Sequence, residues 1–365
     1  MNPNVHVRIA TLPYGGFILK QWQQLKNKIG GRVVIQGSYN TSNIGDLAIG
    51  IAIKRELDKI GIKSHLNGFI NDHRLRTPNF RRYDYHIIGG GGVIRDYPPN
   101  YLETRLDPIG TSRKGSIVLG VGFDGLRTKK GKQQIRKLNE CKAITVRDKK
   151  SQEHLQSYLD KEVEVAACPA FLTESAKPLI NIDENTIGIN LRNLYIDDKW
   201  GSYLYFPDKI NLEERRRWYM GYINNTLKPY LKDVAKERNL VFIPFTKSDI
   251  LFARNYLSDL QIKILPLQPP ENTLGTIQVL DKMICMRYHS IIFSIIANKP
   301  LFVISYHNKT RELAKELAGL TYIDLFSPQS IEVDFTVSSE YLAGIKNRMI
   351  NSAKKNFKIL KKLIR

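Results

Sequence analysis

The sequence predicts an α/β protein made of two doubly wound domains in tandem, each a parallel sheet covered by helices. Three observations lead to this prediction. Short β-branched runs alternate with stretches of helical periodicity. The alternation stops at about residues 169–185, where proline and polar residues gather, and then resumes. The length of 365 residues also suits two domains of roughly 150 residues each.

The first domain is predicted to span residues 1–182. Its strands and helices alternate as a parallel sheet requires. We expect strands at residues 32–36, 85–88, 116–121 and 143–146, and a helix with one apolar face at residues 45–60. Ligands of such sheets gather at the carboxyl ends of the strands, so the loops that follow strands are candidate sites.

The second domain is predicted to span residues 183–337 and repeats this rhythm. We expect strands at residues 186–191, 240–244, 262–265, 282–286 and 301–305. Helices are expected at residues 212–238, 250–260, 273–280 and 290–297. The chain is therefore two α/β units in series.

A basic amphipathic helix is predicted for the end of the chain, residues 338–365. Residues 340–365 carry eight Lys or Arg and one Glu, and apolar residues recur every three or four positions. Two interpretations stay open. The apolar stripe packs on the protein while the lysines are solvated, or the basic face contacts anionic lipid head groups.

The chain carries 56 Lys and Arg against 35 Asp and Glu, a formal charge of +21. This excess indicates an anionic partner: nucleic acid, an acidic membrane surface, or a phosphorylated or carboxylated small molecule. Nucleic-acid binding rests on charge alone, because zinc-finger spacing and aromatic RNA-binding motifs are absent from the sequence. We expect a cytoplasmic protein, with peripheral contact at the inner face of the membrane left open. Apolar runs such as residues 291–296 fall short of the roughly 20 residues that span a bilayer, and the N-terminus lacks a signal-peptide core.

The three cysteines are scattered, which predicts neither a disulfide framework nor a zinc ribbon. A reducing compartment fits this pattern.

Polar residues 37–46 connect the first predicted strand to the first helix. Asn43 and Asp46 are placed to cap this helix, and backbone N–H groups of the loop would face the crevice. Helix capping alone is one explanation of the motif, and ligand binding is the other.

Four consecutive glycines, Gly89 to Gly92, are expected just after the strand at residues 85–88, ahead of Asp96. Glycines cost conformational entropy, so another group must approach the backbone closely there. A bound ligand and tight inter-domain packing both satisfy this requirement. The spacing does not match the dinucleotide-binding fingerprint.

Arg147 follows the strand at residues 143–146 and precedes a helix that begins near Ser151. A guanidinium beside a helix N-terminus suits a carboxylate or a phosphate. The alternative is a surface ion pair with Asp148.

Two neighbouring strand-end loops in the second domain supply five polar residues: Arg287, Tyr288, His289, Tyr306 and Lys309. Cations converging beside helix N-termini, together with an imidazole, predict an anion pocket with a titratable proton donor. His307 is a weaker candidate. None of the other histidines has the spacing of metal ligands, so we expect no metal.

Taken in order, these motifs resemble the polysaccharide pyruvyl transferase family. The resemblance covers residues 37–320 and rests on Asn43-Ile44-Gly45-Asp46, the four glycines with Asp96, Val146-Arg147-Asp148 with Ser151, Pro169-Ala170-Phe171, and Arg287-Tyr288-His289 with Tyr306 and Lys309. It implies a GT-B-like fold, with two Rossmann-like domains facing a cleft. It also implies transfer of pyruvate from phosphoenolpyruvate, as a ketal, onto a sugar of a cell-surface polysaccharide or lipid-linked glycan. The chain departs from the family at Cys168, where many members have Asp, and at Tyr288 within the usual triplet.

The resemblance also implies residue roles. Three cations would bind the donor: Arg147, Arg287 and Lys309. His289 would protonate the methylene carbon, since an adjacent anion favours the protonated imidazole. The positions of Asp46 and Asp96 near strand ends, and not the resemblance, make one or the other the candidate to accept the proton of the sugar hydroxyl. The other substrate-binding residues would be Asn43, Gly90, Gly91, Ser151, Tyr288 and Tyr306. The scheme needs neither cofactor nor metal.

A glycosyltransferase of the same architecture that uses a nucleotide sugar is the alternative. Such enzymes usually need a carboxylate that grips the ribose from the second domain. Glu271 is the evident candidate for that role.

Overall fold

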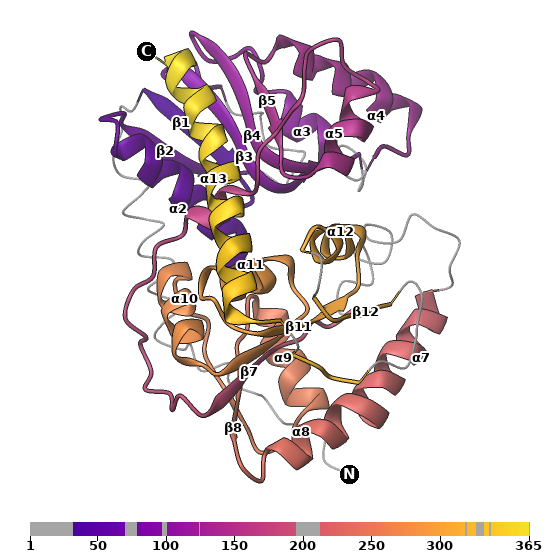
Figure 1. Cartoon of the computed structure of the whole chain (residues 1–365). Coiled ribbons are helices and arrows are strands. Elements are labelled where there is room, and N and C mark those ends of the chain that lie inside the picture. The colour runs from indigo at the N-terminus through magenta and orange to yellow at the C-terminus, as the bar shows by residue number, and fades with distance from the viewer. Residues whose placement is uncertain are drawn as a thin grey trace, which may run out of the picture.

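The computed structural model describes residues 32–69, 79–96, 101–123, 125–194, 212–317, 320–325, 332–335 and 337–364. These residues form two parallel six-stranded sheets, one above the other in Figure 1, with helices around them. The predicted α/β class with two doubly wound sheets is confirmed. Among the described residues, no helix combines the length and the apolar character needed to cross a membrane.

The first sheet has the strand order β2-β1-β3-β4-β5-β6. Its strands are β1 (Val33–Gly37), β2 (Ser64–Gly68), β3 (Tyr85–Ile94), β4 (Gly115–Phe123), β5 (Ile144–Val146) and β6 (Glu164–Val165). Its helices are α2 (Ile44–Asp58), α3 (Tyr101–Leu106), α4 (Lys129–Gln134) and α5 (Lys149–Gln156), with the 3-10 helices η1 (Ile135–Glu140) and η2 (Pro169–Leu172). The central strands are buried along nearly their whole lengths, as in sheets covered on both faces.

The second sheet has the strand order β12-β11-β10-β7-β8-β9. Its strands are β7 (Thr186–Asn190), β8 (Asn239–Phe242), β9 (Ile262–Ile264), β10 (Lys282–Cys285), β11 (Leu301–Ser305) and β12 (Tyr322–Asp324). Its helices are α7 (Leu212–Tyr222), α8 (Lys228–Val234), α9 (Lys247–Tyr256), α10 (Pro270–Val279), α11 (Tyr288–Ile296) and α12 (Asn308–Glu316). The helix predicted at residues 212–238 is interrupted by a π-helical turn, η3 (Ile223–Leu227), and ends earlier than expected.

The four glycines lie inside β3 rather than after a strand, which corrects the expectation. Helix α2 packs closely on the first part of this run. A Cβ atom at Gly90, where φ is +54°, would lie 2.1 Å from Cγ2 of Ile49. The hydroxyl of Tyr39 donates to the carbonyl of Gly89 at 3.0 Å. Intradomain packing therefore accounts for these two glycines, and it replaces the inter-domain packing considered above.

The strand order reverses between β1 and β3 in the first sheet and between β7 and β10 in the second. Doubly wound sheets bind ligands outside the carboxyl ends of their strands at this switch point. A backbone hydrogen bond connects the two regions. The N–H of Ile44, at the start of α2, donates to the carbonyl of Phe245, after β8, at 3.0 Å. The fold thus brings two ligand-binding edges together.

Helix α13 (Ser339–Ile364) runs past both domains (Figure 1) and contacts α11, η2 and β4. One stripe of it is buried: Leu342, Ile345, Met349, Ala353, Asn356, Leu360 and Ile364. The Asn356 amide donates to the carbonyl of Ala167 at 2.9 Å and accepts from the hydroxyl of Thr145 at 2.5 Å. The apolar stripe therefore packs on the protein, and most of the lysines of the helix are exposed.

Candidate functional site

A cavity of about 240 Å³ lies between the carboxyl ends of the two sheets. Loops that follow strands in both domains line it. Its charged lining consists of six cations and two carboxylates: Arg95, Arg127, Arg147, Arg192, Arg287, Lys309, Asp46 and Asp96. Walls dominated by one sign of charge concentrate ligands of the opposite sign, so the cavity suits an anion.

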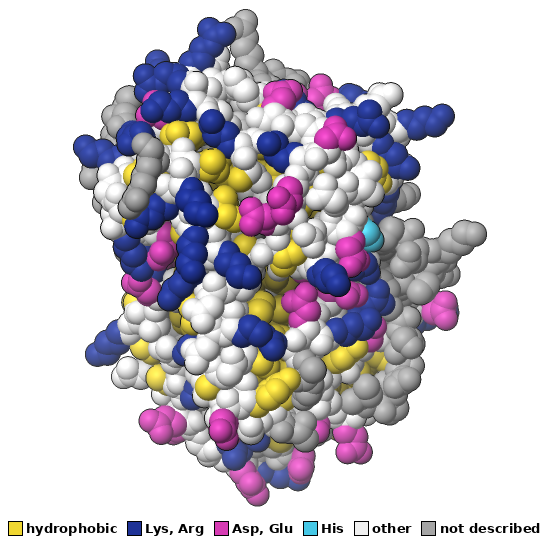
Figure 2. Space-filling view, turned by 45° about the horizontal axis from the view of Figure 1, so that its top comes forward, with side chains coloured by type: hydrophobic (Ala, Val, Ile, Leu, Met, Phe, Trp, Pro, Cys, Tyr) yellow, Lys and Arg dark blue, Asp and Glu magenta, His cyan; other side chains and the backbone are white. Residues whose placement is uncertain are grey.

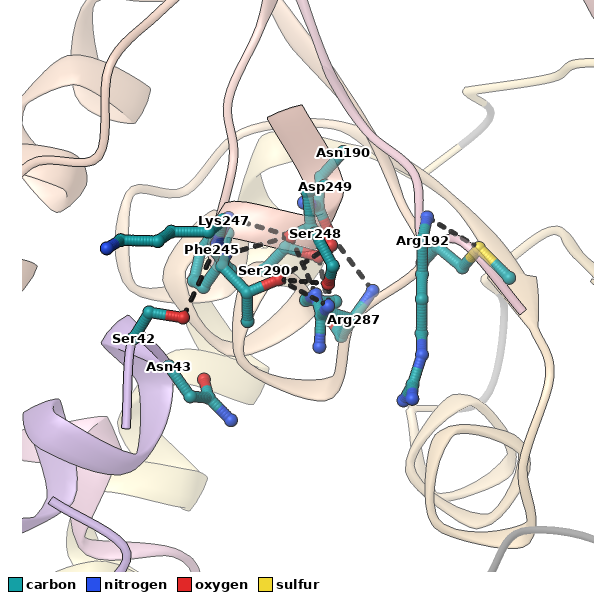
Figure 3. Close-up of polar contacts among 12 residues, drawn as sticks. Ser42, Asn43, Asn190, Arg192, Phe245, Lys247, Ser248, Asp249, Arg287 and Ser290 are labelled. Atoms are coloured by element: carbon teal, nitrogen blue, oxygen red, sulfur yellow. Dashed lines mark hydrogen bonds and ion pairs between the residues drawn. The ribbon is translucent and has the colours of Figure 1, made fainter. Parts of the chain in front are cut away.

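Arg287, the residue before α11, is held by a buried carboxylate (Figure 3). Its Nε donates to Oδ2 of Asp249 at 2.7 Å, and its Nη2 donates to Oδ1 of Asp249 at 2.5 Å and to the hydroxyl of Thr246 at 2.8 Å. Asp249 is 0% exposed and also accepts from the N–H of Phe245. The guanidinium is thus oriented before any ligand arrives. Its Nη1 makes no hydrogen bond to a described residue, which leaves it for an anion in the cavity.

His289 lies where the two domains meet. A Cβ atom at Gly45 would lie 2.0 Å from its Nδ1, so the close contact between the imidazole and α2 requires glycine. On the other side of the ring, Nε2 lies 3.9 Å from Sγ of Cys168. Burial raises the pKa of the Cys168 thiol to about 11, so its neutral form faces the imidazole. A neutral thiol contacts the imidazole without placing a charge beside it.

The charge of His289 depends on what occupies the cavity. Burial lowers its pKa well below the ordinary value, and three cations lower it further: Lys309, Arg147 and Arg287. These shifts favour the neutral imidazole, and the expected protonated form stays a prediction for the site with an anion bound. The expectation assumed a bound anion, and an anion among these cations would oppose their effect. Ligand binding and protonation of His289 are coupled.

The first turn of α2 carries Asp46 into the cavity. Oδ1 of Asn43 accepts from the N–H of Gly45 at 3.0 Å, which caps the helix, and Nδ2 of Asn43 donates to Oδ2 of Asp46 at 2.9 Å. Burial raises the pKa of Asp46. Four cations oppose this shift: Lys309, Arg95, Arg287 and Arg147. Helix capping by this loop is confirmed, and because the capping residues also line the cavity, ligand binding by the same loop stays a prediction.

Arg147 combines an ion pair with an aromatic contact. Its guanidinium carbon lies 4.4 Å from the ring centroid of Tyr288, and its Nε lies 3.2 Å from Oδ2 of Asp148. A Cβ atom at Gly122 would lie 2.2 Å from its Nη2, so β4 makes room for it. The side chain is 2% exposed, so this is a buried group facing the cavity and not the surface ion pair of the alternative.

Asp96 holds the chain after β4. Its Oδ2 accepts from the N–H groups of Arg127 and Thr128, at 2.9 and 2.6 Å, and from the hydroxyl of Thr128 at 2.8 Å. The carboxylate lines the cavity, but three donors already occupy this oxygen. This oxygen is therefore more fully engaged than Oδ2 of Asp46, which accepts from Asn43.

The predicted site residues line one cavity, with two exceptions. Gly90 faces Ile49 of α2, as described above. The hydroxyl of Ser151 points to the backbone N–H of Phe123, at 3.0 Å, and its own N–H donates to the Asp148 carboxylate, which caps α5. Both residues therefore shape the walls without facing the cavity.

On the second-domain side, Tyr306 and Lys309 flank the start of α12. The Tyr306 hydroxyl accepts from Nη1 of Arg192 at 3.0 Å. His307 caps α12, with its Nδ1 accepting from the N–H of Lys309 at 3.1 Å, which fits its weaker candidacy. Among the described residues, no group of His, Cys, Asp and Glu side chains is arranged to hold a metal ion.

A family model described as polysaccharide pyruvyl transferase matches residues 43–308. The chain belongs to this family. The match begins at Asn43, at the cap of α2, and ends at Asn308, the first residue of α12, so it includes both halves of the cavity. No curated protein is matched in sequence.

Solved structures with similar folds include sugar-nucleotide enzymes. A UDP-GlcNAc 2-epimerase from Methanocaldococcus jannaschii, in complex with UDP-GlcNAc and UDP, has a TM-score of 0.50 and 11% identity, covering 90% of this chain and 99% of that one. The S. aureus MnaA-UDP structure also has a TM-score of 0.50 and 11% identity, covering 88% and 90%. A glycosyltransferase from Rickettsia africae reaches 0.49 at 10% identity, covering 93% and 100%. At such identities the likeness concerns the fold, which is GT-B-like.

Several residues that line or support this cavity were not predicted from sequence. They are Arg95, Tyr101, Arg127, Arg192, Asn308 and the buried Asp249. Arg95 and Arg192 lie at or just after the ends of β3 and β7, so the rule that selected Arg147 would have found them. Asp249 lies two residues inside α9 and gives no local signal of its pairing with Arg287.

The candidate ribose carboxylate of the alternative lies elsewhere. Oε1 of Glu271 is 3.1 Å from Nη2 of Arg55, across the contact between α10 and α2, and Glu271 is absent from the cavity lining. Among the residues that the structure describes, no specific contact of the cavity favours a nucleotide-sugar donor.

Proposed function

We propose that the protein transfers pyruvate from phosphoenolpyruvate onto a sugar as a ketal. The observation that carries this proposal is the placement of His289 among Arg147, Arg287 and Lys309 at one cavity. Phosphoenolpyruvate presents a phosphate, a carboxylate and a carbon that must be protonated. A cluster of cations around one imidazole matches all three requirements.

Donor binding is assigned to three cations held in different ways. Arg287 has a fixed orientation and an Nη1 that is not bonded to any described residue, which suits a planar carboxylate or a phosphate oxygen. Arg147 is fixed by its stacking on Tyr288. Lys309 lies in the first turn of α12, where the helix dipole also favours an anion.

The first chemical step delivers a proton to the methylene carbon of the donor. Bound phosphoenolpyruvate favours the imidazolium form of His289, which then gives its proton to that carbon and leaves an oxocarbenium-like centre at the neighbouring carbon. A sugar hydroxyl attacks this centre, and Asp46 takes its proton.

The second step closes the ketal. Phosphate leaves as its C–O bond breaks, and a second hydroxyl of the sugar attacks the same carbon. His289, which gave its proton to the methylene carbon, takes the proton of the second hydroxyl, and the proton held by Asp46 passes to the released phosphate. Donor and diol are thereby converted to ketal and phosphate without a redox partner.

The test is incubation with phosphoenolpyruvate and candidate glycans, measuring phosphate release and the mass of the glycan. We expect release that depends on both substrates, and a mass increase of one pyruvate ketal. The control is Arg287→Ala, assayed after its fold is verified by circular dichroism. Release that persists unchanged in this variant, or a glycan of unchanged mass, would refute the proposal.

The acceptor is proposed to be a sugar of a cell-surface polysaccharide or of a lipid-linked glycan, reached by an enzyme in peripheral contact with the inner face of the membrane. The family described above supports a polysaccharide acceptor. The net charge of +21 supports work beside an anionic surface.

A further inference from the structure

A second concentration of positive charge lies at the end of the first sheet that is remote from the cavity. The strands of this parallel sheet begin at one edge and end at the other, where the cavity lies. Cations precede strands β1 to β5, and the last turn of α13 adds two more. This surface, here named the basic edge, consists of Arg32, Lys63, Arg81, Arg82, Arg113, Lys114, Lys142, Lys361 and Lys362, all exposed. Figure 2 shows Lys and Arg side chains gathered over the upper part of the molecule.

Backbone hydrogen bonds fix the positions of the basic edge. The N–H of Asp84 donates to the carbonyl of Arg32 at 2.9 Å, and the N–H of Lys114 donates to the carbonyl of Asp84 at 2.7 Å. The N–H of Arg113 donates to the carbonyl of Tyr83 at 3.0 Å. Backbone hydrogen bonds therefore connect the segments that carry these cations, and the charges share one surface.

The C-terminal end of helix α13 lies against this surface. The hydroxyl of Tyr85, the first residue of β3, donates to the carbonyl of Leu363 at 2.8 Å. This contact brings Lys361 and Lys362 to the edge where the strands begin. Lys114 lies beside the same tyrosine, with its Nζ 6.0 Å from the ring centroid.

Few carboxylates compensate these charges. Asp84 is already shared between Arg32, at 3.1 Å, and Arg113, at 2.7 Å. Burial would raise the pKa of Asp84, but its bond to Arg32 and the charge of Arg113 lower it below the ordinary value. Glu140 lies ahead of β5, and residues 160–162 bring two further acids ahead of β6, where the basic edge ends.

One apolar side chain lies at the border of the basic edge. Ile60, between the end of α2 and the start of β2, is 38% exposed. Its neighbour Lys59 pairs with Glu56 and Glu174, so this corner is nearly neutral. An exposed isoleucine beside a cationic surface suits the boundary between head groups and acyl chains.

We propose that the basic edge binds the surface of an anionic bilayer. Its cations are spread along the beginnings of five strands, as an extended charged surface requires. Binding there would leave the cavity, at the opposite edge of the sheet, open to substrates. The inference rests on the membrane contact proposed above, and it assigns that contact to the strand beginnings instead of the long face of α13. It does not depend on pyruvyl transfer.

The test is co-sedimentation of the full chain with phosphatidylcholine vesicles, with and without phosphatidylglycerol. The edge variant is Arg81→Glu with Arg82→Glu. The matched control is Lys354→Glu with Lys355→Glu, an adjacent exposed pair on α13 with the same change of charge. We expect binding only with phosphatidylglycerol, weakened by salt. In the edge variant it should fall at least about 30-fold, as when two cations worth on the order of 1 kcal/mol each are lost. The control should lose less than about threefold.

Several results would overturn the assignment. They are equal binding to neutral vesicles, an absence of binding by the unaltered chain, an equal or larger loss in the α13 variant, and tighter binding of the edge to sheared DNA than to vesicles. Thermal stabilisation by phosphoenolpyruvate, measured on both variants, reports separately on the cavity. Its absence from every protein would count against the proposed function and leave the vesicle result intact.

Discussion

The two sides of the cavity hold their functional groups by different means. On the second-domain side Arg287 is held by charge, since the Asp249 carboxylate, 0% exposed, binds two of its nitrogens. On the first-domain side the start of α2 is held by shape. Gly45 lets the imidazole of His289 lie against the helix, and Gly90 lets Ile49 pack on β3.

This difference separates what each side contributes. A buried ion pair fixes a binding group in advance, and losing one member leaves an uncompensated charge. Close packing against glycine fixes the distance between a catalytic group and its neighbours, and an added atom shifts that distance. We therefore expect changes on the charged side to abolish donor binding, and changes on the packed side to impair turnover while donor binding survives.

The largest effect is expected for Asp249→Ala. Arg287 would then be a nearly buried cation without its partner, which costs about 3–5 kcal/mol of unfolding free energy. Its guanidinium would also lose its orientation, so phosphoenolpyruvate should no longer stabilise the protein. Chemical denaturation and thermal shift with phosphoenolpyruvate measure the two effects.

The matched control is Asp281→Ala, which removes the partner of Arg238 in a pair that is about one third exposed. Screening by water limits that loss to less than about 1 kcal/mol, and the response to phosphoenolpyruvate should stay. Equal losses in the two variants would show that the burial of Asp249 has no special role.

His289→Gln is expected to reduce phosphate release by about 10²–10⁴-fold, the usual contribution of a general acid, with little change in donor binding. Steady-state kinetics and thermal shift test this expectation together. A variant that releases phosphate at the normal rate would remove His289 from the mechanism.

The pH profile should carry a related signature. The pKa of His289 is below its ordinary value, owing to burial and to Lys309, Arg147 and Arg287. The acid form is lost as pH rises, so kcat/KM, which reports the free enzyme, should fall at lower pH than kcat, which reports the donor-bound enzyme. Coincident falls in the two profiles would contradict coupling between donor and proton.

Gly45→Ala tests the packed side. The new Cβ atom would lie 2.0 Å from Nδ1 of His289, so the ring must move. Overpacking of this kind costs about 1–3 kcal/mol, and the displaced imidazole should lower kcat more than it weakens donor binding. Unfolding curves and a comparison of kcat with KM measure these effects.

Gly344→Ala on α13 is the control, because a Cβ atom there meets no atom within 4 Å. Alanine in a helix should raise stability by about 0.5–1 kcal/mol and leave turnover unchanged. If Gly45→Ala behaves in the same way, shape does not position His289.

Sequence reasoning predicted these two sides unequally. Arg287 and His289 follow β10, a buried strand, and the rule that ligands gather at strand ends was enough to select them. Asp249 was missed because it lies in α9, which comes close to Arg287 at the start of α11 only in the folded protein. The glycines of β3 were placed after the strand, whereas the strand continues through them to Ile94, with α2 packed closely on Gly89 and Gly90.

The strands of the fold were also predicted unequally, the buried ones better than those at the sheet edges. The buried strand β11 has a continuous apolar run and lies at the expected bounds, and the buried strand β7 lies within one residue of the expected range. The edge strands β2 and β12 are short and only partly buried, so their sequences carry no pattern that distinguishes them from loops. The lowered pKa of His289 could not be read from sequence either, because it depends on burial and on three cations brought in from separate loops.

The smallest effect is expected for Glu271→Gln. This variant tests whether a charged pair outside the cavity contributes to donor binding. Glu271 binds Arg55 across the two domains at 3.1 Å, with both side chains more than one fifth exposed. Such a pair contributes less than about 1 kcal/mol, so the variant should unfold nearly as the unaltered protein does and release phosphate at the same rate. A nucleotide-sugar enzyme that used this carboxylate would instead lose donor binding. Thermal shift with phosphoenolpyruvate and with UDP-GlcNAc, on the variant and the unaltered chain, separates the two cases: stabilisation by UDP-GlcNAc that disappears in the variant would contradict the pyruvyl donor assigned here.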